Sequence, residues 1–161
     1  MRHAEAEPEN PDQSDFDRVL TPYGQTTAVQ TGRQLQLAGI PIQRILASAA
    51  VRTHLTATLV ARSAAPKAPL QLAKELYAAS HHRIAQVLMA SCPPDENSVL
   101  VVGHNPGIAA LIYQWIGRSF EVPPCTLVVL SADTDDWYQI PTATRSPALL
   151  IRHGSPEPFP Q

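Results

Sequence analysis

The chain has 161 residues, a formal net charge of −2 and a hydrophobic fraction of 44%, which together indicate one globular domain with a substantial core. Because the net charge is slightly negative, we expect neither a nucleic acid nor an anionic membrane as a partner. No apolar run approaches the roughly 20 residues that span a bilayer, and no signal region is visible. With two isolated cysteines, interpreted as buried reduced thiols, these features predict a cytoplasmic protein.

Strand and helix patterns alternate along the first two thirds of the chain. A polar loop follows the first few residues, and Thr21-Pro22 then supplies a helix N-cap and a first-turn proline. In chain order we expect a helix at 21–38, a strand at 44–48, a helix at 51–63, a short strand at 70–72, a helix ending before 92, a strand at 99–102 and a helix from about Pro106.

The pattern changes after residue 125. The segments 126–130 and 137–140 are typical of strands, and the acidic turn between them predicts an antiparallel hairpin. Ala148–Ile151 is a further candidate strand. We expect the domain to span residues 1–153 and the proline-rich tail at 154–161 to be disordered.

This alternation predicts a three-layer α/β/α sandwich with a mostly parallel central sheet. His104 follows the apolar run 99–102 and precedes a helix for which Asn105 is the expected N-cap. Ligands bind at such positions in α/β proteins, and free backbone N–H groups there attract anions. Because the carboxyl ends of parallel strands meet at one edge of a sheet, Arg2, His3 and Arg52 can lie beside His104.

A cluster of two histidines and two arginines suits a phosphate dianion. The forked donors of arginine match phosphate oxygens, and a neutral imidazole can attack phosphorus and carry the phosphoryl group. Arginine also stabilises the charge that develops on those oxygens in the transition state. The sequence has no carboxylate cluster suited to Mg²⁺, so we expect neither a metal nor another cofactor.

Five ordered motifs resemble those of the histidine phosphatase superfamily, which has a phosphoglycerate mutase-like fold. They are MRHAEAEP at 1–8, DRVLTPYG at 17–24, SAAVRT at 48–53, ELY at 75–77 and VGHNPG at 102–107. Each motif alone is weak, but their order and spacing make the resemblance specific. It is greatest to the short branch of SixA-type phosphohistidine phosphatases.

The resemblance implies a role for each residue of the cluster. His3 would be the nucleophile, and the phosphate pocket would be completed by Arg2, Arg52 and His104. Arg18 would lie at the mouth of the pocket and, with Asn105, bind substrate. The implied reaction removes phosphate from a histidine of a phosphorelay or phosphotransfer protein and releases inorganic phosphate.

The chain departs from the family pattern at its first strand. Family members have several apolar residues before the Arg-His pair, and here this central strand is truncated. The segment ALLIRHG at 148–154 resembles that strand and its motif, which makes His153 a second candidate nucleophile. The resemblance nevertheless places Ala148–Ile151 at the edge of the sheet.

Two other functions stay open at this stage. One is a small-molecule phosphomonoesterase of the same superfamily, and the other is an inactive phosphate-binding or partner-binding module. Glu75 is expected to be a structural or rim residue, so no evident acid protonates an alkoxide leaving group, which favours a phosphohistidine over a phosphate ester. The remaining histidines at 54, 81 and 82 are expected to be solvated, and the sequence predicts no oligomeric state.

Overall fold

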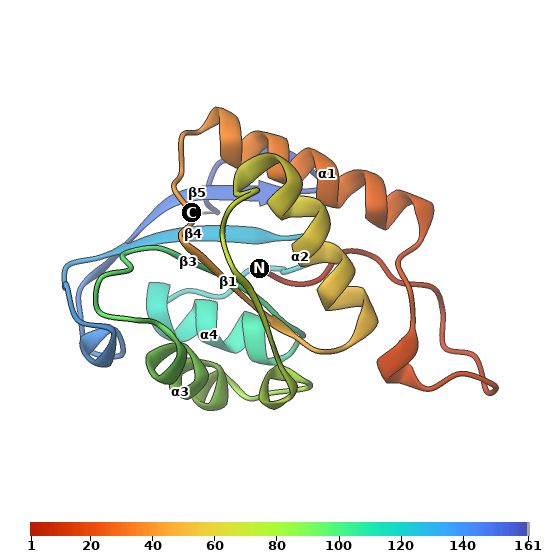
Figure 1. Ribbon diagram of the computed structural model, residues 1–161. Helices are drawn as coiled ribbons and strands as arrows, with labels where there is room; N and C mark the ends of the chain where they lie inside the picture. The colour runs from red at the N-terminus through yellow and green to blue at the C-terminus, as the bar shows by residue number, and fades with distance from the viewer. Residues whose placement is uncertain (161) are drawn as a thin grey trace.

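The computed structural model describes residues 1–160 and has three layers, with a central β layer between two pairs of helices (Figure 1). This layer, called the sheet below, consists of two three-stranded sheets that form its two halves. The α-helices are α1 (Pro22–Leu37), α2 (Val51–Ala64), α3 (His81–Ser91) and α4 (Gly107–Ile116). The strands are β1 (Arg44–Ser48), β2 (Leu70–Ala73), β3 (Val99–Val102), β4 (Leu127–Ala132), β5 (Arg145–Arg152) and β6 (Ser155–Glu157). Short 3-10 helices are η1 (Asp15–Asp17), η2 (Lys74–Leu76) and η3 (Trp137–Gln139). The predicted α/β sandwich is confirmed.

One half of the sheet is parallel, in the order β2-β1-β3. Its strands β1 and β3 are covered on both faces, as their apolar runs predict, whereas β2 is exposed at Gln71 and Leu72. Within β1, the side chains of Ile45 and Ala47 pack in one core cluster with α1 and α2, whereas Leu46 packs in the other with α3 and α4. The carboxyl ends of β1 and β3 therefore lie side by side between two helical layers.

The other half is antiparallel, in the order β4-β5-β6, and here one expectation is wrong. The partner of β4 is β5, and residues 137–139 form η3 instead of a strand. Asp136 caps this turn by accepting from the Tyr138 amide at 2.9 Å, and the Trp137 indole donates to the Glu96 carbonyl at 2.7 Å. These two bonds hold the segment as a compact turn against the amino end of β3.

The carboxyl-terminal tail is also more ordered than its composition suggests. Residues Ser155–Glu157 form β6, which pairs with β5 as an antiparallel strand. Gly154 allows the tight turn between them because it adopts a positive φ of 76°. Ala148–Ile151 lies within β5, which pairs with β4 on one side and with β6 on the other, so the expected placement at the edge of the sheet is wrong.

Residues 1–4 connect the two halves of the sheet. Arg2 forms a parallel bridge with Gly103 at the end of β3, and its amide donates to the Thr126 carbonyl beside β4 at 2.9 Å. On the helical side, Gly24 of α1 packs so closely on the Glu5 carbonyl that a Cβ has no room. The start of the chain thus lies in the middle of the sheet (Figure 1). Within residues 1–160, no helix is long and apolar enough to cross a bilayer.

Candidate active site

His3 is fixed by its main chain between the two halves of the sheet. Its amide donates to the Gly103 carbonyl at 3.0 Å, and its carbonyl accepts from the Cys125 amide at 2.9 Å. The ring Nδ1 lies 2.7 Å from the Ala4 carbonyl oxygen. Because a carbonyl only accepts, Nδ1 carries the proton and Nε2 keeps a free lone pair. Nε2 is therefore the nitrogen available to attack an electrophile.

His104 follows β3 directly and is buried beside His3, with 5.2 Å between the two ring centroids. Its Nδ1 lies 3.4 Å from Nη2 of Arg52, and its Nε2 lies 2.8 Å from the Ser48 hydroxyl at the end of β1. A guanidinium only donates, so Nδ1 accepts and Nε2 donates to Ser48. The predicted proximity of His3 and His104 is present in the structure.

Arg52 reaches the same place from the first turn of α2. Its Nη2 donates to the Asp15 carboxylate at 2.8 Å, and its Nη1 donates to the main-chain carbonyl of Asp15. The same carboxylate accepts from Arg18 Nη1 at 2.8 Å and from the Tyr77 hydroxyl at 2.7 Å. Asp15, on η1, thus joins two arginines and a tyrosine next to the histidine pair.

Arg18 also ties η1 to the segment that follows His3. Its Nε donates to the Glu7 carbonyl at 2.8 Å, and its charge is close enough to lower the pKa of His3. The structure therefore places Arg18 at the edge of the cluster, beside η1.

Arg2 and Asn105 share one main-chain acceptor. The Val122 carbonyl accepts from Arg2 Nη1 at 2.8 Å and from Asn105 Nδ2 at 3.1 Å. The expectation that Asn105 caps a helix is wrong, because α4 starts after Pro106 without a side-chain cap. Within residues 1–160, the buried Nε donors of Arg2 and Arg52 have no hydrogen-bond partner, which fits a site for an anion.

Both imidazoles are neutral at pH 7. Burial lowers the pKa of His3 to about 4, and the charges of Arg52, Arg2 and Arg18 act in the same direction. Burial also lowers the pKa of His104 to about 3, with further lowering from His3 and Arg52. A dianion between these groups would be attracted to the guanidinium charges while His3 keeps an unprotonated nitrogen.

Asp15 stays ionised in this environment. The hydrogen bond from Tyr77 is the largest influence that holds the pKa of the Asp15 carboxyl below its usual range, and the bonds from Arg18 and Arg52 add to it. Asp15 is thus a fixed negative charge and a poor proton donor.

Three polar residues of the cluster were not predicted as site residues: Asp15, Tyr77 and Ser48. Tyr77 and Ser48 lie inside the quoted motifs, and Asp15 stands three residues before Arg18 in a polar loop, but nothing local shows that these side chains converge. Glu75 is exposed on η2, and His54 and His82 are exposed on their helices. Residues 1–160 hold no group of three or more His, Cys, Asp or Glu arranged for a metal ion.

His153 lies away from this network. It is exposed at the turn between β5 and β6, and its Nδ1 is 3.4 Å from the Tyr23 hydroxyl of α1. The preceding Arg152 forms an ion pair with Glu157 at 3.3 Å. The Arg-His pair at 152–153 therefore has partners unlike those of the pair at 2–3.

Comparisons with known proteins show which chains and folds are similar to this one. A family model described as the histidine phosphatase superfamily (branch 1) matches residues 1–77. A proposed phosphohistidine phosphatase SixA from Nakamurella multipartitia has a similar structure, with 27% identity, a TM-score of 0.80 and coverage of 94% of this chain and 92% of its own. The corresponding protein from Agrobacterium tumefaciens is 28% identical, with a TM-score of 0.74 and coverage of 82% and 88%.

More distant structures share the fold. A protein histidine phosphatase SixA complexed with tungstate is 20% identical, with a TM-score of 0.78 and coverage of 95% of this chain and 94% of its own. No curated protein sequence matches the chain. The family model over the first 77 residues and the structural similarity over nearly the whole chain show a phosphoglycerate mutase-like fold, and they support a phosphatase similar to the histidine phosphatase superfamily.

Proposed function

We propose that the protein is a phosphohistidine phosphatase in which His3 is the nucleophile. The observation that carries the proposal is the protonation state of His3, whose Nδ1–H is held by the Ala4 carbonyl while Nε2 stays unprotonated beside Arg2, Arg52 and His104. The similarity to SixA proteins supports the same substrate class. The proposed substrate is a phosphohistidine-bearing protein, with inorganic phosphate as the product.

The proposed reaction has two displacements at phosphorus. In the first, His3 Nε2 forms a P–N bond as the P–N bond of the substrate breaks, and the substrate imidazole leaves with the electron pair. In the second, water attacks the phosphoryl group on His3, gives up its proton to solvent and releases inorganic phosphate. His3 then leaves as a neutral imidazole, because Nδ1 has kept its proton on the Ala4 carbonyl.

The arginines supply the positive charge for both displacements. Arg52 is buried and Arg2 is partly buried, and the charges of both act on His3, so their guanidinium groups would bind the phosphoryl oxygens. Donors fixed before the reaction stabilise the transition state without reorganisation, and removing one costs about 10²–10³ in rate.

The state of Asp15 favours a phosphohistidine over a phosphate ester. An alkoxide leaving group needs a proton from a nearby acid, whereas an imidazole that already carries a proton on its other nitrogen leaves as a neutral molecule. Asp15 is the carboxyl group bonded within the cluster, and its lowered pKa keeps it ionised. A substrate that needs no general acid fits this arrangement.

The test compares the wild type and two variants on two substrates. A phosphohistidine peptide and a phosphoserine peptide, whose alkoxide leaving group needs a proton, are offered to the wild type, His3→Ala and His153→Ala. We expect the wild type and His153→Ala to prefer phosphohistidine in kcat/KM, and His3→Ala to lose activity toward both. An acid-labile, base-stable phosphoenzyme should form in the wild type and be absent from His3→Ala. Loss of the label only in His153→Ala would reject the assignment of His3.

A further inference from the structure

Ser48 lies at the carboxyl end of β1 and is fully buried next to His104. Its Oγ is 2.8 Å from His104 Nε2 and accepts from the Ala50 amide at 3.4 Å. Within residues 1–160, the hydroxyl makes no other hydrogen bond. Because an amide N–H only donates, His104 Nε2 is the one acceptor in this part of the chain for the Ser48 hydroxyl proton.

Arg52 and Ser48 both need an acceptor on the His104 ring, and a neutral imidazole has only one unprotonated nitrogen. With the ring proton on Nε2, Nδ1 accepts from Arg52 Nη2 at 3.4 Å, and the Ser48 hydroxyl proton has no acceptor. With the ring proton on Nδ1, Ser48 donates to Nε2, but Nδ1 and Arg52 Nη2 are then two donors that face each other. Either tautomer leaves one buried donor unsatisfied, which costs free energy.

A phosphoryl oxygen beside Nδ1 would remove this conflict. One such oxygen has several lone pairs, so it can accept from His104 Nδ1 and from Arg52 Nη2 together. His104 Nε2 is then free to accept from Ser48. Arg52 loses little, because its contact with Nδ1 is long and because its two bonds to Asp15 already hold the guanidinium in place.

We propose that Ser48 is a positioning residue that lets His104 reverse its tautomer when a phosphoryl group binds. The inference rests on the proposed phosphate site and adds a residue and a proton position to it. The ring stays neutral, because water takes the proton from Nε2 and supplies one to Nδ1 while the Ser48 hydroxyl turns from accepting to donating. His104 thereby adds a fixed N–H donor to the guanidinium groups that face the phosphoryl oxygens.

The surroundings of His104 favour a neutral ring over an imidazolium. Burial lowers the pKa of His104 to about 3, and His3 and Arg52 lower it further, against a smaller opposing effect of the Asp15 carboxylate. A hydroxyl can accept or donate without a change of charge, so Ser48 suits either neutral tautomer. An alanine at this position would support neither.

The first experiment is nitrogen NMR of the full chain with isotope-labelled histidines, because ring nitrogens with and without a proton have well-separated chemical shifts. In the wild type at pH 7, the His104 proton should be on Nε2 without phosphate and on Nδ1 at saturating inorganic phosphate. His104→Gln assigns the signals. His3 serves as the internal reference, since the Ala4 carbonyl should keep its proton on Nδ1 throughout.

Each result of this titration distinguishes the inference from the function on which it rests. If phosphate shifts the His3 signals and the His104 proton stays on Nε2, the phosphate site stands and the tautomer reversal is wrong. Protons on both His104 nitrogens would also overturn the reversal, because the ring would then be charged. If saturating phosphate shifts no histidine signal, the proposed phosphate site is wrong together with the inference.

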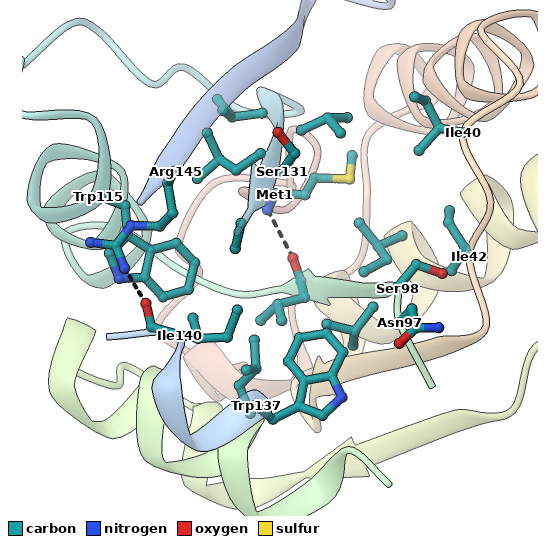
Figure 2. A pocket seen from close by; sticks show the side chains of 18 of the residues that line it. Met1, Ile40, Ile42, Asn97, Ser98, Trp115, Ser131, Trp137, Ile140 and Arg145 are labelled. Atoms are coloured by element: carbon teal, nitrogen blue, oxygen red, sulfur yellow. Dashed lines mark hydrogen bonds between the residues drawn. The ribbon is translucent and has the colours of Figure 1, made fainter. Parts of the chain in front are cut away.

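The second experiment removes the Ser48 hydroxyl. Ser48→Ala should raise the Ki of inorganic phosphate and lower kcat by about tenfold each, the loss of one buried hydrogen bond, and Ser48→Thr should restore both. The matched control is Ser98→Ala, at the amino end of β3, where Figure 2 shows Ser98 beside Asn97 at a cavity of about 430 Å³ lined by β3 and β4. A wild-type Ki in folded Ser48→Ala, or an equal rise in Ser98→Ala, would overturn the positioning role.

Discussion

The same dipeptide, Arg-His, occurs at two places in the molecule with different surroundings. Arg2-His3 lies between β3 and β4, where His3 is 5.2 Å from His104 between ring centroids and is flanked by guanidinium groups. Arg152-His153 lies at the turn between β5 and β6, where Arg152 pairs with Glu157 and stacks 5.4 Å from the Phe120 ring. His153 is exposed, with a positive φ of 50°.

The difference between the two Arg-His pairs shows which part of this fold brings catalytic groups together. The groups around His3 come from the ends of parallel strands, which the sheet gathers at one edge, whereas the antiparallel turn gathers few partners from elsewhere in the chain. A dipeptide motif therefore identifies a nucleophile here only together with its place in the sheet.

The largest expected effect compares the two histidines directly. His3→Ala should lower kcat/KM for a phosphohistidine peptide by about 10³-fold or more, because the attacking nitrogen is lost. His153→Ala should stay within about twofold of the wild type, since its side chain is exposed and outside the cluster. Steady-state turnover of both variants, with circular dichroism to check folding, decides the comparison. Equal losses of kcat/KM in the two variants would contradict the assignment of His3 as the nucleophile.

Substitution of Arg52 should lower kcat/KM and substitution of Arg152 should not, with a smaller difference than between the two histidines. Arg52→Lys keeps a positive charge but loses the fork that contacts Asp15 and His104, so kcat/KM should fall about 10²-fold. Arg152→Lys is the matched control and should retain nearly full activity. Inhibition by inorganic phosphate provides a second readout, and its Ki should rise in Arg52→Lys alone. An unchanged Ki would place Arg52 outside the phosphate site.

Asp15 allows the positioning of the arginines to be tested. Asp15→Asn removes the charge that holds Arg52, Arg18 and Tyr77 together, and we expect kcat/KM to fall about tenfold through misplaced donors. Asp12→Asn changes an exposed carboxylate on the same loop and should have little effect. Tyr77→Phe should reproduce part of the loss. A purely structural role for Asp15 would lower the melting midpoint and leave kcat and KM of the folded fraction unchanged.

The smallest effect is the pH dependence of stability. An unfolded imidazole binds its proton near pH 6.5, whereas the pKa values of folded His3 and His104 are about 4 and about 3. The unfolded chain thus binds more protons as pH falls from 6.5, and the unfolding free energy decreases by up to about 1.4 kcal/mol per pH unit for each imidazole. Urea unfolding from pH 7 to pH 4.5 measures this slope. The slope of the unfolding free energy against pH should be shallower in His3→Asn than in the wild type and unchanged in His153→Ala. An equal slope in the wild type and both variants would contradict the buried neutral state of His3.

The amino-acid sequence by itself determined most of the regular elements up to residue 117. Thr21 and Pro22 start α1 through a local cap, and the unbroken apolar runs identify β1 and β3 as strands covered on both faces. The gathering of His3, Arg52 and His104 also follows from sequence, because alternation of strands and helices implies parallel strands with a common carboxyl edge.

Only the tertiary structure decided the rest, because the deciding bonds join residues far apart in the chain. Trp137 forms a 3-10 turn because its indole reaches the Glu96 carbonyl, although its local pattern is typical of a strand. Asp15 joins two arginines and Tyr77 only after η1 folds against α2.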